Sequence, residues 1–267
     1  MSLQALNTGA TGMIAQSQNL DVIANNLANA STDGFKSSRA NFEDLLYKVV
    51  KIPGAGNQGD DQTPSQGVQF GVGTRVSATQ LNLQQGNIRQ TGRALDIAIN
   101  GIGFLRTLDL QGNDLYTRSG NLTLNSNGQI VMATATQGYI VQPPVTIPDD
   151  ALSISIDAQG QVAITQRGNN VPQIVGQFDA VRFINPEGLQ QLGENLFKET
   201  GASGPPIIGQ FEQDSFGQIN QTFLEASNVE PVDQLINLIT SQRVFEINSQ
   251  VIQTANENLQ TVGTLRQ

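Results

Sequence analysis

The chain has 267 residues, of which 38% are hydrophobic and only 14% are charged, and its formal net charge is -9. The surplus of acidic side chains argues against nucleic acid and anionic membrane surfaces as partners, because both attract Lys and Arg. The sequence contains no Cys and no His, which removes disulfides, thiolate nucleophiles and the commonest general base and metal ligand.

The first segment predicts a long amphipathic helix. Its stripe positions alternate in spacing between three and four residues, which is the heptad pattern of a coiled coil. The stripe consists of Leu3, Leu6, Ala10, Met13, Ser17, Leu20, Ala24 and Leu27. Gly9 and Gly12 would weaken such a helix by up to ~1 kcal/mol each relative to Ala. Residues 1–18 hold neither a basic region nor a continuous apolar run, so we expect no cleavable secretory signal.

An asparagine-rich stretch, NNLANASTDGFK, closes this helix. Because Asn and Gly tolerate left-handed backbone conformations, residues 31–34 are predicted to form the turn where the helix ends. Asn25, Asn26 and Asn29 lie within or beside the last heptad. We interpret them as neutral hydrogen-bonding contacts between packed copies of the chain, with Phe35 anchoring the segment that follows.

Residues 31–67 form a predicted connector rich in turn-forming residues. Within it, NFEDLLYKVV (41–50) fits either a short helix or a strand. Gly54, Gly56 and Gly59 match G-x-G-x-x-G, the glycine pattern of a dinucleotide-binding loop. The stretch DDQTPSQG that follows would break the helix that such a site requires, so a Gly-rich loop is the favoured interpretation.

After the connector the hydrophobic period changes from 3.6 to 2, which is typical of strands with one buried face. The alternating runs are QLNLQQGNIRQ, LDIAING, NLTLNSNGQIVM, LSISIDAQGQVAIT and QFDAVRFIN. Residues 125–128 (NSNG) and 157–160 (DAQG) are hairpin-turn signals within such runs. These patterns predict an all-β central body of short antiparallel strands, barrel- or sandwich-like.

The last segment predicts a second long helix, from Pro231 to about Val262, without an internal Gly or further Pro. Its apolar residues Leu238, Phe245, Ile252 and Leu259 recur every seven positions. The polar positions of the first helix are almost all neutral. A neutral polar face suits a helix packed among copies of itself, because any charge would stand beside its own image. A two-helix coiled coil on the surface of a monomer is the alternative.

Because the helical ends flank the β pattern, we expect an α+β fold. The N- and C-terminal helices would pair as a coiled-coil stem, and the β body would be inserted between them. The stem comprises residues 1–30 and 231–267, an extended connector comprises 31–67 and 216–230, and the β body spans 68–215.

Residue patterns that carry catalysis or metal binding are missing. The adjacent carboxylates Asp60-Asp61 and Asp149-Asp150 lie in predicted loops, whereas acid–base pairs usually come from distant sequence positions and flank a substrate. Such loops lack the spacing of an EF-hand calcium site. A serine nucleophile would need a base other than His, and no motif places one. We therefore expect no enzyme activity, no cofactor and no metal site.

Four stretches resemble the axial proteins of the bacterial flagellar rod and hook. NLDVIANNLANASTDGFKSSRANFEDLLY is similar to the N-terminal motif of that family, and EASNVEPVDQLINLITSQRVFEINSQVIQTANENL to its C-terminal motif. LDIAINGIGFL and YTRSGNLTLNSNGQIV resemble motifs of its β body. The chain length and the connector after Tyr47 resemble distal rod members rather than hook proteins, which usually carry a further outer domain.

The resemblance implies a structural function. Many copies would stack helically into a hollow rod that crosses the periplasm in the flagellar basal body and transmits torque from motor to hook. The stripe residues of both helices, with Asn25, Asn26, Asn29 and Phe35, would lie between subunits. Implied partners are further copies, other rod and hook proteins and the surrounding basal-body rings, without membrane insertion, and the flagellar type III apparatus would export the chain. The alternatives are a proximal rod protein, or a secreted β-domain binding module with a coiled-coil stalk.

Overall fold

The computed structural model describes residues 2–52, 67–109, 111–133, 137–167 and 169–264. Contacts within the chain divide it into two compact units. The helical unit comprises Met1–Ala28, Ser38–Gln80 and Glu230–Gln267, and the β unit comprises Asn29–Ser37 and Leu81–Val229. The α+β composition, with strands between two terminal helices, agrees with the sequence prediction.

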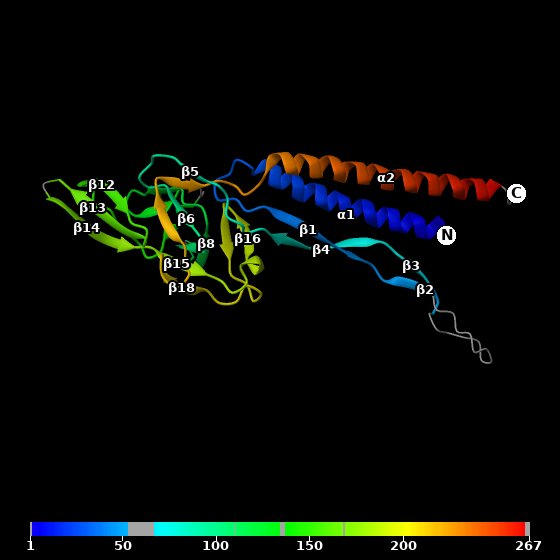
Figure 1. Ribbon diagram of the computed structural model, residues 1–267, viewed down its shortest axis with the longest axis horizontal. Helices are drawn as coiled ribbons and strands as arrows, with labels where there is room; N and C mark the ends of the chain where they lie inside the picture. Colours follow the sequence, from blue (N-terminus) through cyan, green and yellow to red (C-terminus); the bar gives the residue numbers. More distant parts are fainter. Residues whose placement is uncertain (1, 53–66, 110, 134–136, 168, 265–267) are drawn as a thin grey trace. The chain divides into compact units, whose positions relative to one another are not determined.

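Two antiparallel helices, α1 (Ser2–Ala28) and α2 (Pro231–Thr264), lie side by side in the helical unit (Figure 1). Both begin and end close to where the periodicity of the sequence predicts. The turn predicted after the first helix is also confirmed: the Thr32 N–H donates to the Asn29 carbonyl at 3.1 Å, and Gly34 adopts a φ of 75°. Gly tolerates this left-handed conformation because it has no Cβ.

In the part of the helical unit that the structure describes, four strands accompany the helices: β1 (Ser38–Asp44), β2 (Tyr47–Lys51), β3 (Val68–Gly71) and β4 (Thr74–Leu81). β1 pairs with β4 and packs against α1, and β2 pairs antiparallel with β3. The stretch 41–50, which fitted either a helix or a strand, is therefore two strands. The expected start of the β body at residue 68 differs from this division, because β3 and most of β4 belong with β1 and β2.

The described residues of the β unit form sixteen short strands and one short 3-10 helix, Pro186–Gly188. The strands are β5 (Ile88–Gln90), β6 (Ile97–Asn100), β7 (Phe104–Leu108), β8 (Asp114–Thr117), β9 (Leu122–Leu124), β10 (Ile130–Met132), β11 (Ile140–Val141), β12 (Ala151–Ile156), β13 (Gln161–Gln166), β14 (Asn169–Gln177), β15 (Asp179–Arg182), β16 (Gln190–Gly193), β17 (Leu196–Lys198), β18 (Ile207–Gln210), β19 (Gln218–Gln221) and β20 (Phe223–Glu225). Nine of them form one sheet, and β12, β13 and β14 form another.

Both hairpin turns predicted from the sequence are present. The Gly128 N–H donates to the Asn125 carbonyl at 3.0 Å between β9 and β10, and the Gly160 N–H donates to the Asp157 carbonyl at 2.9 Å between β12 and β13. Both glycines have a positive φ, of 73° and 79° respectively. These turns fix the register of the strands that they join.

Two apolar clusters form the core of the β unit. The larger cluster includes Ile97, Leu105, Leu122, Ile130 and Phe178, each almost fully buried. The smaller cluster is aromatic and consists of Leu81, Phe104, Tyr116, Val181, Phe183, Leu189 and Phe197. The segment 216–230, expected as connector, supplies β19 and β20 to this unit, where they pair with β6 and β5.

Candidate assembly surfaces

The two helices meet along a seam that is displaced by one residue from the stripe predicted on α1. Gly9 faces Ile252 and Gly12 faces Asn248. A Cβ added at Gly9 would lie 2.9 Å from Ile252 Cγ1, and one at Gly12 would lie 3.0 Å from Asn248 Nδ2. The glycines therefore let the backbones approach closely, a role that the sequence analysis missed because it counted only their cost to helix stability.

The rest of the seam is unusually polar. Asn19 Nδ2 donates to Ser241 Oγ at 2.9 Å, and Asn26 Nδ2 approaches Gln234 Oε1 at 3.5 Å. The less exposed positions of α2 include Leu238, Ile252 and Leu259 of the predicted heptad and a second heptad of Gln234, Ser241, Asn248 and Ala255, whereas Phe245 is exposed and the neighbouring Val244 is half-buried. The neutral amides noted in the sequence thus pair partly within one chain.

Asn26 is buried and hydrogen-bonded within the helical unit. Its side chain is only 3% exposed, its Nδ2 donates to the Ser38 carbonyl at 2.7 Å, and its Oδ1 accepts from the Ser38 N–H at 3.0 Å. An amide that bonds both backbone groups of one residue holds the end of α1 to the start of β1. Asn26 therefore makes internal contacts of the helical unit, and the expected contact between copies stays a prediction.

The other predicted residues fall into two classes of exposure. The half-buried ones are Leu6, Ala10, Met13, Leu20, Leu27, Asn29, Phe35, Leu238, Ile252 and Leu259, and the exposed ones are Ala24, Asn25 and Phe245. The side chain of Leu3 lies outside the described residues. Asn29 accepts from the Thr32 hydroxyl at 3.2 Å and so belongs to the turn. A role for any of these residues between subunits stays a prediction.

A broad apolar surface remains uncovered on the helices. On α2 it consists of Val232, Leu235, Ile236, Ile239, Ile247, Val251 and Val262, between 43% and 65% exposed. On α1, Ile14 is 61% exposed. Soluble monomers rarely expose large contiguous apolar areas, and such areas mark interaction surfaces.

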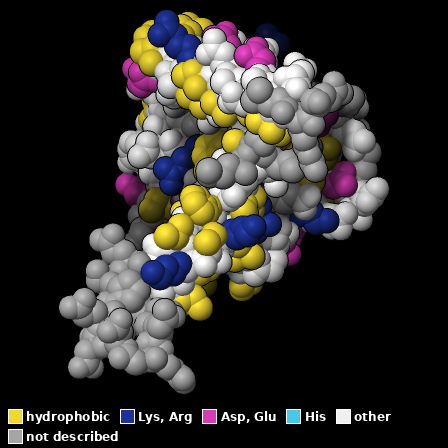
Figure 2. All heavy atoms as spheres, turned by 90° about the vertical axis from the view of Figure 1, so that its right-hand side faces the viewer, with side chains coloured by type: hydrophobic (Ala, Val, Ile, Leu, Met, Phe, Trp, Pro, Cys, Tyr) yellow, Lys and Arg dark blue, Asp and Glu magenta, His cyan; other side chains and the backbone are white. Residues whose placement is uncertain are grey.

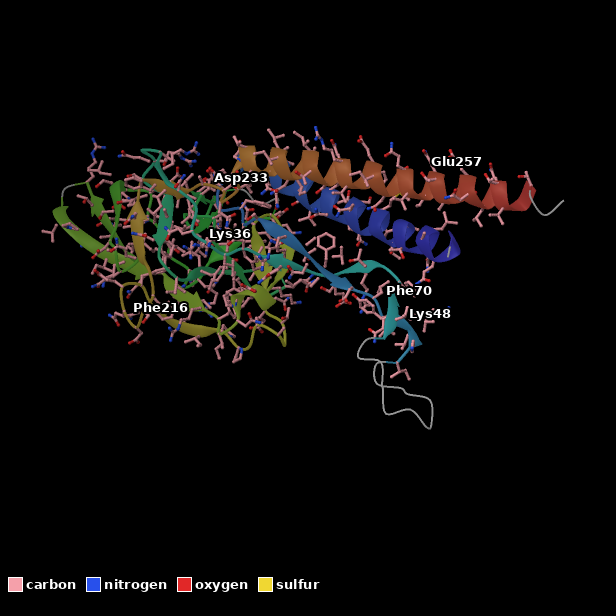
Figure 3. All side chains as sticks on the ribbon, turned by 45° about the vertical axis from the view of Figure 1, so that its right-hand side comes forward. Lys36, Lys48, Phe70, Phe216, Asp233 and Glu257 are labelled. Carbon is pink, nitrogen blue, oxygen red and sulfur yellow. The ribbon has the colours of Figure 1, made fainter. Side chains whose placement is uncertain are left out.

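The strand ribbon of β2 and β3 is a second exposed apolar element. All of its side chains are exposed. Large apolar residues exposed on the ribbon and its flanks are Phe42, Leu46, Tyr47, Val49, Val50, Ile52, Val68 and Phe70. Lys48 is the cross-strand partner of Phe70, as Figure 3 shows, and Figure 2 shows hydrophobic and basic side chains together on the face toward the viewer.

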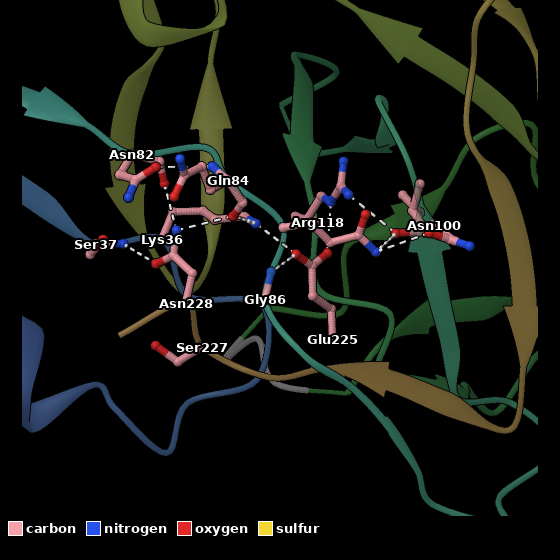
Figure 4. Close-up of polar contacts among 12 residues, drawn as sticks. Lys36, Ser37, Asn82, Gln84, Gly86, Asn100, Arg118, Glu225, Ser227 and Asn228 are labelled. Atoms are coloured by element: carbon pink, nitrogen blue, oxygen red, sulfur yellow. Dashed lines mark hydrogen bonds and ion pairs between the residues drawn. The ribbon is translucent and has the colours of Figure 1, made fainter. Parts of the chain in front are cut away.

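A buried ionic network joins distant segments within the β unit (Figure 4). Glu225 Oε1 lies 2.6 Å from Lys36 Nζ, and Glu225 Oε2 lies 2.7 Å from Arg118 Nε. The Arg118 guanidinium also donates to the carbonyls of Ile99, Gly101 and Gly103. The network ties Lys36, in the segment Asn29–Ser37, to Glu225 at the end of β20, both within the β unit.

The same part of the β unit contains neutral hydrogen bonds as well as a carboxyl group whose pKa is lowered. The Ser37 N–H donates to Asn228 Oδ1 at 2.8 Å, and Asn228 Nδ2 donates to the carbonyls of Asn82 and Gln84. Burial opposes ionisation of Glu225, but the charges of Arg118 and Lys36 outweigh it and hold the pKa of Glu225 below its ordinary value. Sequence reasoning missed this network because no local motif marks it.

The glycine and aspartate patterns that could indicate a nucleotide, catalytic or metal site gain no support from the described residues. Gly54, Gly56, Gly59 and the pair Asp60-Asp61 lie outside the described residues, and Asp149 and Asp150 are exposed. Among the residues that the structure describes, no three His, Cys, Asp or Glu side chains gather as metal ligands. Within that same part of the chain, neither helix has the length and apolar character needed to cross a bilayer.

Comparisons with known families place the chain among flagellar axial proteins. Residues 6–36 match the flagella basal body rod protein family, residues 98–164 match the flagellar hook protein FlgE/F/G D1 domain, and residues 220–265 match the flagellar basal body rod FlgEFG protein C-terminal domain. These three matches include most of α1, part of the β unit and all of α2.

Relatives that align with almost the entire chain identify the protein family more narrowly. The chain is 42% identical to the flagellar basal-body rod protein FlgG of Caulobacter vibrioides, over 99% of this chain and all of the relative. It is 40% identical to that of Borreliella burgdorferi and 35% identical to that of Bacillus subtilis, over 99% of both chains in each case. The chain belongs to the FlgG family of flagellar basal-body rod proteins, whose members are structural.

Proposed function

We propose that the protein is the self-assembling subunit of the distal flagellar rod. Many copies stack helically into a hollow shaft that transmits torque from the motor to the hook. The terminal helices form the inner tube around an export channel, and the β units face outward. The stem at 1–30 and 231–267 is the assembly domain of this proposal, with the ribbon strands at its flank.

The observation that carries this proposal is the uncovered apolar surface of the two long helices. Within one copy, α1 and α2 cover the seam between them, but the apolar side chains of α2 from Val232 to Val262 stay exposed. Burial of apolar area contributes ~25 cal/mol per Å², so neighbouring copies that cover this face gain stability. The exposed ribbon of β2 and β3 offers a further contact to neighbours and would stiffen the shaft.

The location and partners follow from membership of the rod family. We place the chain in the basal body where it crosses the periplasm, in contact with other rod and hook proteins and with the surrounding rings. Export by the flagellar type III apparatus, without a cleavable signal, is part of the same proposal. No step of this function requires catalysis.

Deleting residues 1–30 tests the assembly role. The truncated chain should keep the circular dichroism of the β unit and lose polymerisation, because α1 supplies half of the helix pair. Electron microscopy of the purified full-length and truncated chains provides the measurement. Tubes formed by the truncated chain would overturn the proposal.

A second deletion provides the matched control. Removing residues 53–66 shortens the connector without touching α1, α2 or the strands on either side. This variant should still polymerise, although with a more flexible shaft. A full-length chain that stays monomeric at high concentration, with α1 and α2 firmly protected from hydrogen exchange, would favour a secreted module with a coiled-coil stalk.

A further inference from the structure

A half-enclosed cavity lies in the β unit beside the ends of β6, β7 and β15. Its volume is about 300 Å³, and its apolar lining includes Ile102, Phe104, Phe183 and Pro186. Ile102 is 65% exposed and stands between Gly101 and Gly103, whose φ angles are 111° and 146°. Only Gly adopts such angles without strain. The two glycines therefore allow the backbone conformation that places Ile102 at the rim of the cavity.

The charged groups of the cavity wall are all cations. Lys36, Arg118 and Arg182 line it. The first two share Glu225, whereas Arg182 has no carboxylate within ion-pair distance among the described residues. Its guanidinium lies 5.3 Å from the centre of the Phe216 ring, and its Nε is buried without a hydrogen-bond acceptor. A fitting occupant combines an apolar side chain with a carboxylate.

The segment Asp149–Leu152 of the same chain has this chemistry. Leu152 is 67% exposed at the start of β12, and Asp149 and Asp150 before it are exposed as well. In the part of the chain that the structure describes, neither carboxylate takes part in an ion pair. Asp150 Oδ1 only accepts a hydrogen bond from Gln166 Nε2 at 3.3 Å.

We propose that the cavity of one copy receives the segment Asp149–Leu152 of a neighbouring copy. Leu152 would enter beside Ile102 and Phe183, and Asp150 would pair with Arg182. This inference rests on the self-assembly proposed above and names one of its contacts. The complementarity is specific, because a cationic apolar cavity meets an acidic apolar segment in a chain whose net charge is -9.

The positions of the two partners suit an open polymer. Within the β unit, Lys36 at the cavity lies toward the end opposite to the sheet of β12, β13 and β14 (Figures 1 and 3). A contact between two different patches of the same protein is heterologous, and it generates a helix unless the rotation happens to close a ring. The same contact could therefore repeat along many copies.

Site-directed crosslinking tests the contact directly. The chain has no Cys, so the variants Ile102→Cys and Leu152→Cys each carry a single thiol. Both side chains are mostly exposed, and neither substitution should affect folding. The two variants are mixed, polymerised and treated with a short bis-maleimide. A crosslinked dimer that contains one copy of each variant is expected, and mixing the variants excludes a link within one chain.

Val171→Cys serves as the matched control, because Val171 is as exposed as Leu152, at 67%, and lies on β14 outside the proposed contact. Its mixture with Ile102→Cys should give at least tenfold less crosslinked dimer. Equal crosslinking from both mixtures would overturn the cavity contact, and so would the absence of crosslinked dimer in samples whose polymers are seen by electron microscopy. Either result would leave the assembly proposal intact. Failure of the mixtures and of the unmodified chain to polymerise would overturn both.

A charge exchange gives an independent readout. Arg182→Glu should raise the concentration needed for polymerisation at least tenfold, and adding Asp150→Arg should restore most of this loss. The far-ultraviolet circular dichroism of each variant shows whether the β unit is folded. Polymerisation of a folded Arg182→Glu variant at the unmodified concentration, or failure of the second substitution to restore it, would contradict the pairing of Arg182 with Asp150.

Discussion

At the scale of single residues, Glu225 holds a buried ionic network of the β unit together. Its carboxylate is almost fully buried and binds two cations and the Gly86 N–H. Glu225→Ala would leave Lys36 and Arg118 buried without a counter-charge, so we expect the free energy of unfolding to fall by ~3–5 kcal/mol. Urea denaturation measures this change. Asp149→Ala, at an exposed carboxylate, is the control, and equal losses in both variants would contradict the prediction.

Acid should weaken the same network. Burial alone would raise the pKa of Glu225, but Arg118 and Lys36 bring it below the ordinary value of 4.5. The folded pKa is therefore lower than the unfolded one, so the stabilisation is complete above about pH 4.5 and is lost as the pH falls through the folded pKa. Unfolding measured from pH 7 to pH 3 should show this loss, and the loss should be smaller in Glu225→Gln.

In the helical unit, Asn26 is the residue that joins two segments through its side chain, as Glu225 does in the β unit. Asn26→Lys would break two hydrogen bonds to Ser38 and place a charge where the side chain is 3% exposed. We expect polymerisation to suffer strongly while the β unit, which Asn26 does not belong to, keeps its stability. A thermal melt followed by tyrosine fluorescence, together with sedimentation of polymers, separates the two effects. A variant that polymerises normally would show that this anchor is dispensable.

At the scale of the elements, the glycines of α1 and α2 should respond in opposite ways to substitution. A larger side chain at Gly12 meets Asn248 across the seam, whereas a Cβ at Gly263 meets nothing within 4 Å. Gly263→Ala should stabilise α2 by up to ~1 kcal/mol through helix propensity. Gly12→Leu should instead separate the helices and lower the helical content. Far-ultraviolet circular dichroism reports the helical content of both variants, and equal gains in both would contradict a close approach of the helices at Gly12.

The elements themselves were predictable wherever local sequence determines them. The heptad spacing predicted both helices, and Asn125–Gly128 predicted a hairpin because its turn chemistry is local. The seam of α1 was displaced by one residue from the prediction, since Gly9 and Gly12 contribute contact by the absence of a side chain. The role of Asn26 was also missed, because its partner Ser38 lies beyond the turn.

At the scale of the whole molecule, the two units should differ in protection from hydrogen exchange. The β unit has buried apolar clusters, whereas the helices expose apolar side chains from Val232 to Val262. In dilute monomer we expect β6 and β7 to be protected, and residues 1–30 and about 235–267 to exchange rapidly. Polymerisation should then protect both helices. Mass spectrometry of exchanged peptides measures this, and protected helices in the monomer would contradict the prediction.

The buried ionic network around Glu225 also limits when the β unit can finish folding during synthesis. Lys36 and Glu225 are 189 positions apart in the chain, and β19 and β20 reach back to β6 and β5. Lys36 leaves the ribosome long before Glu225 is made, so the β unit stays unclosed until almost its entire length has emerged. Contacts this distant in sequence slow folding. The β unit therefore cannot complete its fold until β20, which carries Glu225, has been made.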